Sequence, residues 1–250
     1  MPRYGTEKLH LDIKDNLDSA NIKMGRDGFL KFARNHRLLV PKTRRYHITT
    51  DSKHFFRKSP NLIKDIVPTY AEQVFVSDIT YIKLQDKHAY LALVTDLYSK
   101  KIMGYKMEIN MRVPMVKDAL TMALKNCEHN HPTIIHHSDR GIQYCCPDYS
   151  EFAQDRGMIL STTEKSDPYE NAVAERINGI LKYEFGLNRQ IPTLEIANKM
   201  LSEAVNTYNN QRRHRSLKMA TPAYAHTNQT HTYRSFKKDP TRAKGPGECW

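Results

Sequence analysis

The chain has 250 residues, a formal net charge of +12 and four cysteines, none of them in a CxxC pair. This length can bury a substantial core, and so few cysteines exclude a disulfide framework. The longest apolar run, Tyr90 to Val94, is too short to span a bilayer and the charged N-terminus is not a signal peptide, so we expect a cytoplasmic protein without a membrane partner.

The positive charge is concentrated at the two ends of the chain. Lys and Arg outnumber Asp and Glu by 15 to 7 over residues 1–70 and by 9 to 2 over residues 211–250, whereas residues 71–210 hold 15 basic and 18 acidic residues. Such a division suits an enzyme that acts on nucleic acid, because basic ends attract the polyanion while the core keeps carboxylates for metal ions. Two solvated basic tails on an unrelated core are the alternative.

Residues 1–40 carry the first predicted elements. Apolar residues recur at helical spacing over residues 6–18 and 26–38, and residues 21–25 form a short turn between them. The unit resembles a helix-turn-helix, although two packed helices without a role in DNA binding would show the same pattern. On the DNA-binding interpretation, the second helix presents Arg26, Lys31 and Arg34 to the nucleic acid.

Residues 73–223 have the pattern of a mixed α/β domain. Residues 73–84, 88–96 and 101–107 are rich in β-branched and aromatic residues, which predicts three consecutive antiparallel strands. The remaining predicted elements are helices over 113–126, 149–156, 168–186 and 193–211 and short strands over 133–136 and 158–161. A meander followed by alternating helices and strands is typical of a mixed sheet with flanking helices.

Two basic segments flank this domain. Residues 41–72 are polar and lack a sustained period, so we predict a linker that lies over the core or over DNA. After Pro222 the apolar content drops, and we predict a basic, mobile tail over residues 224–250.

Two aspartates occupy positions in or after predicted strands. Asp78 interrupts the hydrophobic run of the first strand, where it shares a face with Val76 and Thr80. Asp139 follows the short strand IIHH at its C-terminal end, where ligands bind in open α/β sheets. Either aspartate alone would equally suit a turn or a cap, so their interpretation depends on a third acidic residue.

That third residue is Glu175, in a helix with a well specified start. Asp167 is a good N-cap, Pro168 suits the first helical position, and Glu170 completes an arrangement like a capping box. At about 100° per residue, one helix face gathers four polar residues, namely Asn171, Glu175, Asn178 and Lys182. This face suits a metal ligand with phosphate contacts beside it, whereas an ordinary solvated face is the alternative.

Three carboxylates suit phosphodiester chemistry, because two magnesium ions held by oxygen ligands can activate the attacking oxygen and stabilise the leaving group. Manganese is expected to substitute. A zinc site is not expected, because the spacing of the histidines and cysteines between residues 129 and 146 does not fit a structural zinc motif.

Several motifs together resemble a known family. Asp78 lies in SDITYI, Asp139 lies in HHSDRGIQY, 35 residues separate Asp139 from Glu175, and Lys182 follows seven positions later. Downstream, Arg212, Arg213 and His214 lie in YNNQRRHRSLKMATP. From about Tyr4 to Pro222 the chain is similar to the retroviral-integrase-type transposases of bacterial insertion sequences, specifically to their second-reading-frame product.

The resemblance implies an RNase H-like core in which Asp78, Asp139 and Glu175 hold Mg2+, with Mn2+ as a substitute. It implies cleavage of element ends and attack of the 3′ hydroxyls on target DNA, by a homo-oligomer assembled on DNA and with a partner frame product that supplies end recognition. Independently of the resemblance, Lys182, Asn171 and Asn178 are expected to contact DNA because they share the helix face of Glu175. Arg212, Arg213 and His214 are expected to bind DNA as well, whereas complementing the dipole of the preceding helix is the alternative for this basic segment. Because relatives have further helices before the N-terminal unit, the copy is expected to be truncated or to start from an internal Met.

Two alternatives to this function stay open. One is a truncated, non-catalytic DNA-binding derivative that regulates transposition. The other is an RNase H-like nuclease, such as a ribonuclease or a junction resolvase, although such compact enzymes have no need for the basic linker or the YNNQRRH segment.

Overall fold

A five-stranded mixed sheet in the order β3-β2-β1-β4-β5 forms the centre of the protein. The computed structural model describes residues 4–39, 55–56, 58–129, 131, 133–164 and 171–229. The strands are β1 (Val74–Lys83), β2 (His88–Asp96), β3 (Ile102–Glu108), β4 (Ile134–Ser138) and β5 (Met158–Thr162). The first three form the antiparallel meander predicted from the sequence, and β4 and β5 run parallel to β1.

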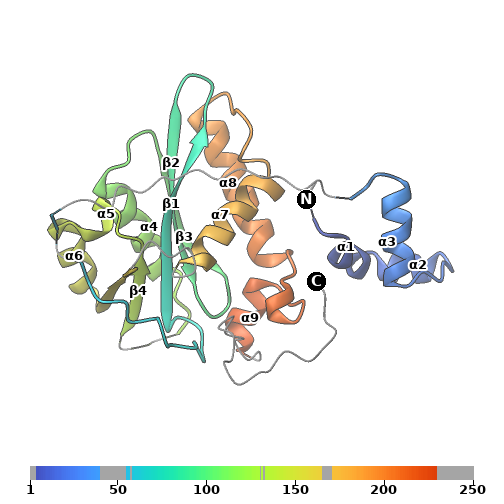
Figure 1. The fold of residues 1–250 in the computed structure, drawn as a ribbon, viewed down its shortest axis with the longest axis horizontal. Coiled ribbons are helices and arrows are strands. Elements are labelled where there is room, and N and C mark those ends of the chain that lie inside the picture. The colour runs from blue at the N-terminus through green and yellow to red at the C-terminus, as the bar shows by residue number, and fades with distance from the viewer. Residues whose placement is uncertain are drawn as a thin grey trace.

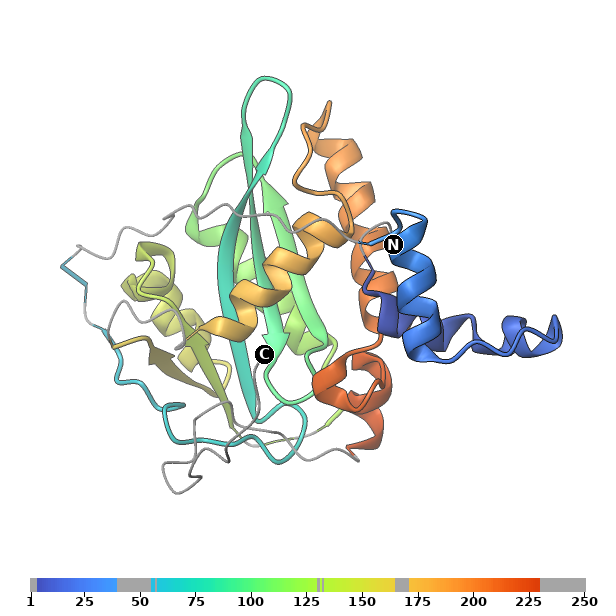
Figure 2. The same ribbon diagram turned by 45° about the vertical axis from the view of Figure 1, so that its right-hand side comes forward.

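Helices cover both faces of this sheet (Figures 1 and 2). On one face lie α4 (Val113–Lys125), α5 (Ile142–Cys145) and α6 (Pro147–Gln154), and on the other lie α7 (Ala172–Glu184) and α8 (Leu194–Asn210). Because side chains alternate along a strand, β1 serves both cores. Phe75 packs with the α4 side, and Ile82 packs with the residues of α7 and α8.

The contact between β3 and α4 is unusually close. A Cβ atom added at Gly104 of β3 would lie 2.1 Å from the carbonyl oxygen of Ala119 and 2.6 Å from the backbone nitrogen of Ala123. Only a residue without a side chain allows these two backbones to approach so closely.

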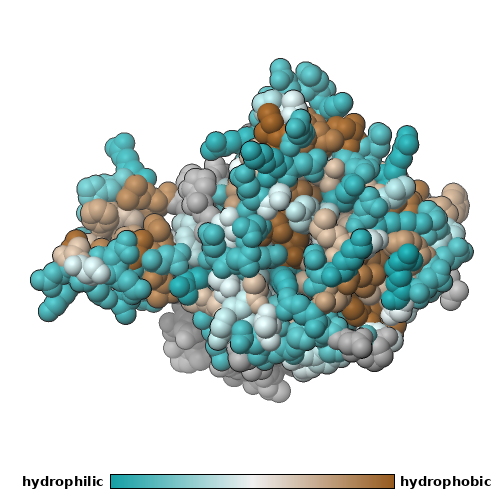
Figure 3. Space-filling model, turned by 180° about the vertical axis from the view of Figure 1, so that it is seen from behind, coloured by the Kyte–Doolittle hydropathy of each residue, from teal (hydrophilic) through white to brown (hydrophobic). Residues whose placement is uncertain are grey.

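Three short helices form a lobe at the side of the sheet domain (Figures 1 and 3). They are α1 (Thr6–Asp12), α2 (Lys14–Ser19) and α3 (Arg26–Asn35), so the helix expected over residues 6–18 is divided in two at Ile13. Phe29 and Ala33 of α3 are buried, whereas Arg26, Lys31 and Arg34 are exposed. Large apolar side chains exposed on the lobe are Leu9, Leu11, Ile22, Phe32, Leu38 and Leu39.

Arg213 joins this lobe to the sheet domain. Its backbone N–H donates to the Tyr4 hydroxyl at 3.2 Å, and its Nε donates to Asp12 at 2.7 Å. Both partners belong to the N-terminal lobe, so residues more than two hundred positions apart in the sequence meet at this junction.

The chain continues after α8 into a 3-10 helix at Arg215–Leu217 and into α9 (Pro222–Asn228). Ala225 and His226 of α9 are buried, so the boundary expected at residue 223 falls inside a packed helix. Of the expected linker, residues 59–62 run along β5, where Ser59 accepts a hydrogen bond from Thr162 and Leu62 donates one to Ser161.

The remaining parts of the expected linker and tail, residues 41–54, 57 and 230–250, lie outside the described residues, as do the expected helix-capping residues Asp167, Pro168 and Glu170. No helix in the described part of the chain is both long enough and apolar enough to cross a membrane.

Candidate active site

The register of β1 and β4 brings Asp78 and Asp139 to adjacent positions. The two strands are parallel, and Ser77 pairs with Ser138 in the last pair of the ladder. Asp78 follows Ser77 and Asp139 follows Ser138, so the two aspartates are neighbours across the sheet. Neighbouring strands are about 4.8 Å apart. Both side chains are partly buried.

Two asparagines attach α7 to β1 beside these aspartates. Asn171 donates from its side-chain nitrogen to the carbonyl oxygen of Ser77 at 3.0 Å, and Asn178 donates to the carboxylate of Asp78 at 2.7 Å. Glu175 lies four residues after the first and three residues before the second, so it occupies the same helix face. Its side chain is more exposed than those of the two asparagines.

Gly141 orients Asp139. Its backbone N–H donates to Oδ1 of Asp139 at 3.0 Å, which forms a turn closed by the aspartate side chain. A Cβ atom at Gly141 would lie 2.9 Å from the same oxygen. Gly141 is not among the site residues predicted from the sequence, although an aspartate followed two positions later by glycine is the signal of such a turn.

The three carboxylates influence one another electrostatically. Burial raises the pKa of Asp78 to about 8, the charges of Asp139 and Glu175 add to this increase, and the hydrogen bond from Asn178 opposes it. Loss of solvent also raises the pKa of Glu175, with a further contribution from Asp139. Crowded carboxylates with raised pKa values form a site that favours a cation.

Lys182 lies at the far end of the same helix face. Burial lowers its pKa, while attraction to Asp78 opposes that change, so the ammonium group lies within electrostatic reach of the site. The other two residues of this face that were expected to contact DNA have a different environment. Asn171 and Asn178 are only 6% and 4% exposed, and their amides bind β1 instead of lying open to solvent as the prediction of DNA contacts required.

The DNA contacts expected at Arg212 and His214 are also corrected by the structure. Arg212 is 1% exposed and donates two hydrogen bonds of 2.7 Å to the Glu184 carboxylate. It also lies 2.9 Å from Nε2 of His214, which is buried as well. A buried guanidinium that is already paired with a carboxylate is unavailable to phosphate, and Arg213 is engaged with Asp12 in the N-terminal lobe.

Comparisons with known proteins agree with this fold. One integrase core domain family matches residues 68–168, and a second family with the same description matches residues 156–222. The intasome structure of simian T-cell lymphotropic virus is similar at a TM-score of 0.57 and 17% identity, over 78% of this chain and 67% of the other. The HTLV-2 integrase catalytic core, solved with magnesium, has a TM-score of 0.50 and 18% identity over 63% of this chain and 97% of the other. The predicted RNase H-like α/β fold is confirmed.

Relatives among bacterial insertion elements are more similar in sequence. The insertion element IS600 31 kDa protein of Shigella sonnei is 34% identical over 88% of this chain and 80% of its own length. The transposase of IS904 from Lactococcus lactis is 33% identical over 68% of this chain and 70% of its own length. The chain therefore belongs to the transposases of bacterial insertion sequences, with a core of the integrase type.

Proposed function

We propose that this chain is a DDE transposase that cleaves DNA at insertion-sequence ends and joins those ends to target DNA in a metal-dependent reaction. The main support is the convergence of Asp78, Asp139 and Glu175. Two of them are adjacent through the β1–β4 register, and the third lies on the helix face that two asparagines attach to β1.

The donor set fits magnesium. Carboxylate oxygens are the ligands that this ion prefers. Burial, and then the charges of Asp139 and Glu175, raise the pKa of Asp78 to about 8, and a bound dication would favour the ionised carboxylate. Asp78, Asp139 and Glu175 would hold the metal, and manganese is expected to substitute. When bound, two such ions supply charge neutralisation, an activated oxygen nucleophile and a stabilised leaving group.

The surrounding residues act on the carboxylates and on DNA. Asn178 holds the carboxylate of Asp78, and the N–H of Gly141 holds that of Asp139. The positive charge of Lys182, on the same helix face as Glu175, would contact a phosphate beside the scissile bond. Fixed groups that are aimed at the reacting phosphate lower the barrier because they need no reorganisation during the reaction.

The N-terminal lobe would add DNA affinity, while a partner frame product supplies recognition of the element ends. Arg26, Lys31 and Arg34 of α3 are exposed and would supply positive charge. The large exposed apolar residues on the same lobe suit contact with another protein, and the expected partners are further copies of this chain and an upstream frame product.

A cleavage assay tests the proposal. The full chain is incubated with magnesium or manganese and labelled duplexes of insertion-sequence ends. We expect nicking that leaves 3′ hydroxyls, followed by joining to target DNA. Asp139→Asn should abolish both steps and retain DNA binding, whereas Asp86→Asn, at an exposed position in the β1–β2 turn, should retain activity.

Each other outcome identifies a different function. Binding by the wild type without nicking would indicate a regulatory DNA-binding derivative. Nicking without joining would favour a nuclease of the same fold, and nicking by Asp139→Asn would refute the assignment of the site.

A further inference from the structure

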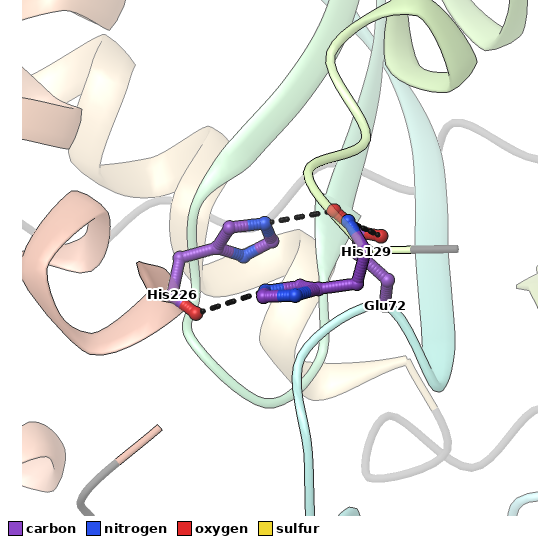
Figure 4. Close-up of side chains that lie close together, drawn as sticks. All are labelled: Glu72, His129 and His226. Atoms are coloured by element: carbon purple, nitrogen blue, oxygen red, sulfur yellow. Dashed lines mark hydrogen bonds and ion pairs between the residues drawn. The ribbon is translucent and has the colours of Figure 1, made fainter. Parts of the chain in front are cut away.

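A second group of metal-ligating side chains lies outside the carboxylate site. Glu72 immediately precedes β1, His129 lies in the loop after α4, and His226 belongs to α9 (Figure 4). One potential ligand atom from each residue lies within 4.8 Å of the other two. The side chains of Glu72 and His226 are 0% exposed, and His129 is half-buried.

Glu72 is held in a fixed orientation. Its two carboxylate oxygens accept hydrogen bonds from the backbone N–H groups of Glu128 and His129, at 2.6 Å and 3.0 Å. One of these oxygens, Oε1, also lies 3.0 Å from Nε2 of His226. Figure 4 shows that oxygen and the imidazole nitrogen pointing toward each other.

The other ring nitrogen of His226 faces acceptors. Nδ1 lies 3.0 Å from the Ser99 hydroxyl and 3.4 Å from the carboxylate of Asp96. Histidines that bind metals usually donate their second ring N–H to a carboxylate, which leaves the opposite nitrogen unprotonated and directed at the ion. In His226 the opposite nitrogen is Nε2, which lies at hydrogen-bond distance from Glu72. Burial lowers the pKa of His226, but its hydrogen bonds to Asp96 and Glu72 outweigh this and raise the pKa, so a metal ion would displace the proton between Nε2 and Glu72.

His129 supplies a second imidazole. Its Nε2 lies 3.1 Å from the side-chain nitrogen of Gln229 and 3.4 Å from the carbonyl oxygen of His226. In the tautomer in which Nε2 accepts the amide N–H of Gln229, this nitrogen has a lone pair, and it could coordinate a metal after giving up that hydrogen bond. The imidazoles of His129 and His226 lie against each other, with ring centres 5.6 Å apart.

We propose that Glu72, His129 and His226 bind one zinc ion. Two imidazole nitrogens and one carboxylate oxygen form a ligand set that zinc accepts, whereas magnesium prefers oxygen ligands alone. Ligand atoms that are each about 2 Å from one ion stand about 3.3 Å apart in a tetrahedron. The 3.0 Å between Glu72 and His226 is close to that value, and a small rotation of the half-buried His129 would complete the set.

This site is separate from the carboxylates that would act on DNA. Glu72 and Asp78 are six residues apart along an extended segment, which corresponds to about 20 Å. The zinc would instead fasten α9 and the loop after α4 to the start of β1. The inference is therefore independent of the proposed strand transfer, and either can fail without the other.

Zinc binding by the full chain tests the inference. Metal-free protein is titrated with zinc in excess magnesium, which occupies the carboxylate site, and the bound zinc and melting temperature are measured. We expect one zinc per chain and a rise in Tm of about 5–10 °C at a hundredfold excess over Kd. Cobalt in place of zinc should give the visible absorption of a four-coordinate site with nitrogen and oxygen ligands.

Variants distinguish the ligands from other groups. His129→Gln should weaken zinc binding at least about tenfold, because it removes one ligand and leaves the buried contacts of His226 in place. His88→Gln, at an exposed strand end, and Asp139→Asn should bind zinc as the wild type does. The proposal would be overturned if His129→Gln bound zinc with the affinity of the wild type. It would also be overturned if the wild-type protein took up no stoichiometric zinc and gave no such cobalt spectrum.

Discussion

Asp78 is placed in an environment that opposes its own ionisation. Burial and neighbouring carboxylates raise its pKa to about 8 from an ordinary value of 3.8. Between these pH values the folded protein holds a proton that the unfolded chain has lost, so this group's contribution to stability falls as the pH rises through that window. A metal ligand is thereby maintained at the expense of stability.

Asp78→Asn should therefore stabilise the protein when no divalent metal is present. At pH 8 in a chelator we expect a rise in Tm of about 2–4 °C, corresponding to about 1 kcal/mol, because the amide removes the charge and can still accept the hydrogen bond of Asn178. The difference from the wild type should shrink toward pH 5, where Asp78 is protonated in the folded state. A variant that melts below the wild type at pH 8 would contradict this explanation.

Gly141 provides a test of how finely Asp139 must be oriented. In Gly141→Ala the new methyl group would meet Oδ1 of Asp139 at 2.9 Å and displace the carboxylate. We expect strand transfer to fall about a hundredfold with little change in Tm, because small displacements of catalytic groups have effects of that size.

The matched control for this substitution is Gly179→Ala in α7, where an added Cβ meets no atom within 4 Å. That variant should keep its activity and gain about 0.5–1 kcal/mol of stability from the helical alanine. Similar losses of activity in both variants would mean that the contact with Asp139 is not the cause.

At the scale of elements, the pairing of β3 with α4 depends on one glycine. Gly104→Ala would place a methyl group 2.1 Å from a backbone oxygen of α4, and backbone cannot move aside as a flexible side chain can. We expect a loss of about 3 kcal/mol or more in the free energy of unfolding, measured by urea denaturation. Gly28→Ala is the control, since its nearest neighbour would be the side chain of Met24 at 3.5 Å; if both variants unfold at the same urea concentration, the close packing is not limiting.

The sequence predicted the strands and long helices of the core well, because their apolar periods are regular. The spacing of Asn171, Glu175 and Asn178 in the sequence also predicted the polar face of α7. Which of these residues would be buried was not predictable, because burial depends on β1, whose Ser77 and Asp78 lie about a hundred positions earlier.

The same limit applies to Arg212 and to the histidine cluster. An arginine in a basic segment is typical of DNA binding, and nothing nearby in the sequence reveals that Glu184, 28 residues away, pairs with it. Glu72, His129 and His226 are separated more widely still, so a search for closely spaced ligands could not bring them together.

At the scale of the whole molecule, the basic N-terminal lobe should contribute to DNA affinity through counterion release. Lys31→Glu on α3 should lower the affinity for duplex DNA and reduce the slope of log affinity against log salt by about 1. Lys125→Glu, exposed at the end of α4 on the sheet face away from α7, should leave the slope unchanged. Equal slopes for the two variants, measured by fluorescence anisotropy across several salt concentrations, would argue against a role for the lobe.

The contact between Glu72 and His226 also has a consequence for synthesis of the protein. Glu72 and His226 are 154 positions apart. During translation, Glu72 and Asp96 are therefore synthesised long before His226, the residue that contacts both of them. Until residue 226 emerges, burial of both carboxylates would be costly, and the start of β1 should remain exposed to chaperones and proteases. We therefore expect this end of the sheet to fold only after residue 226 has left the ribosome.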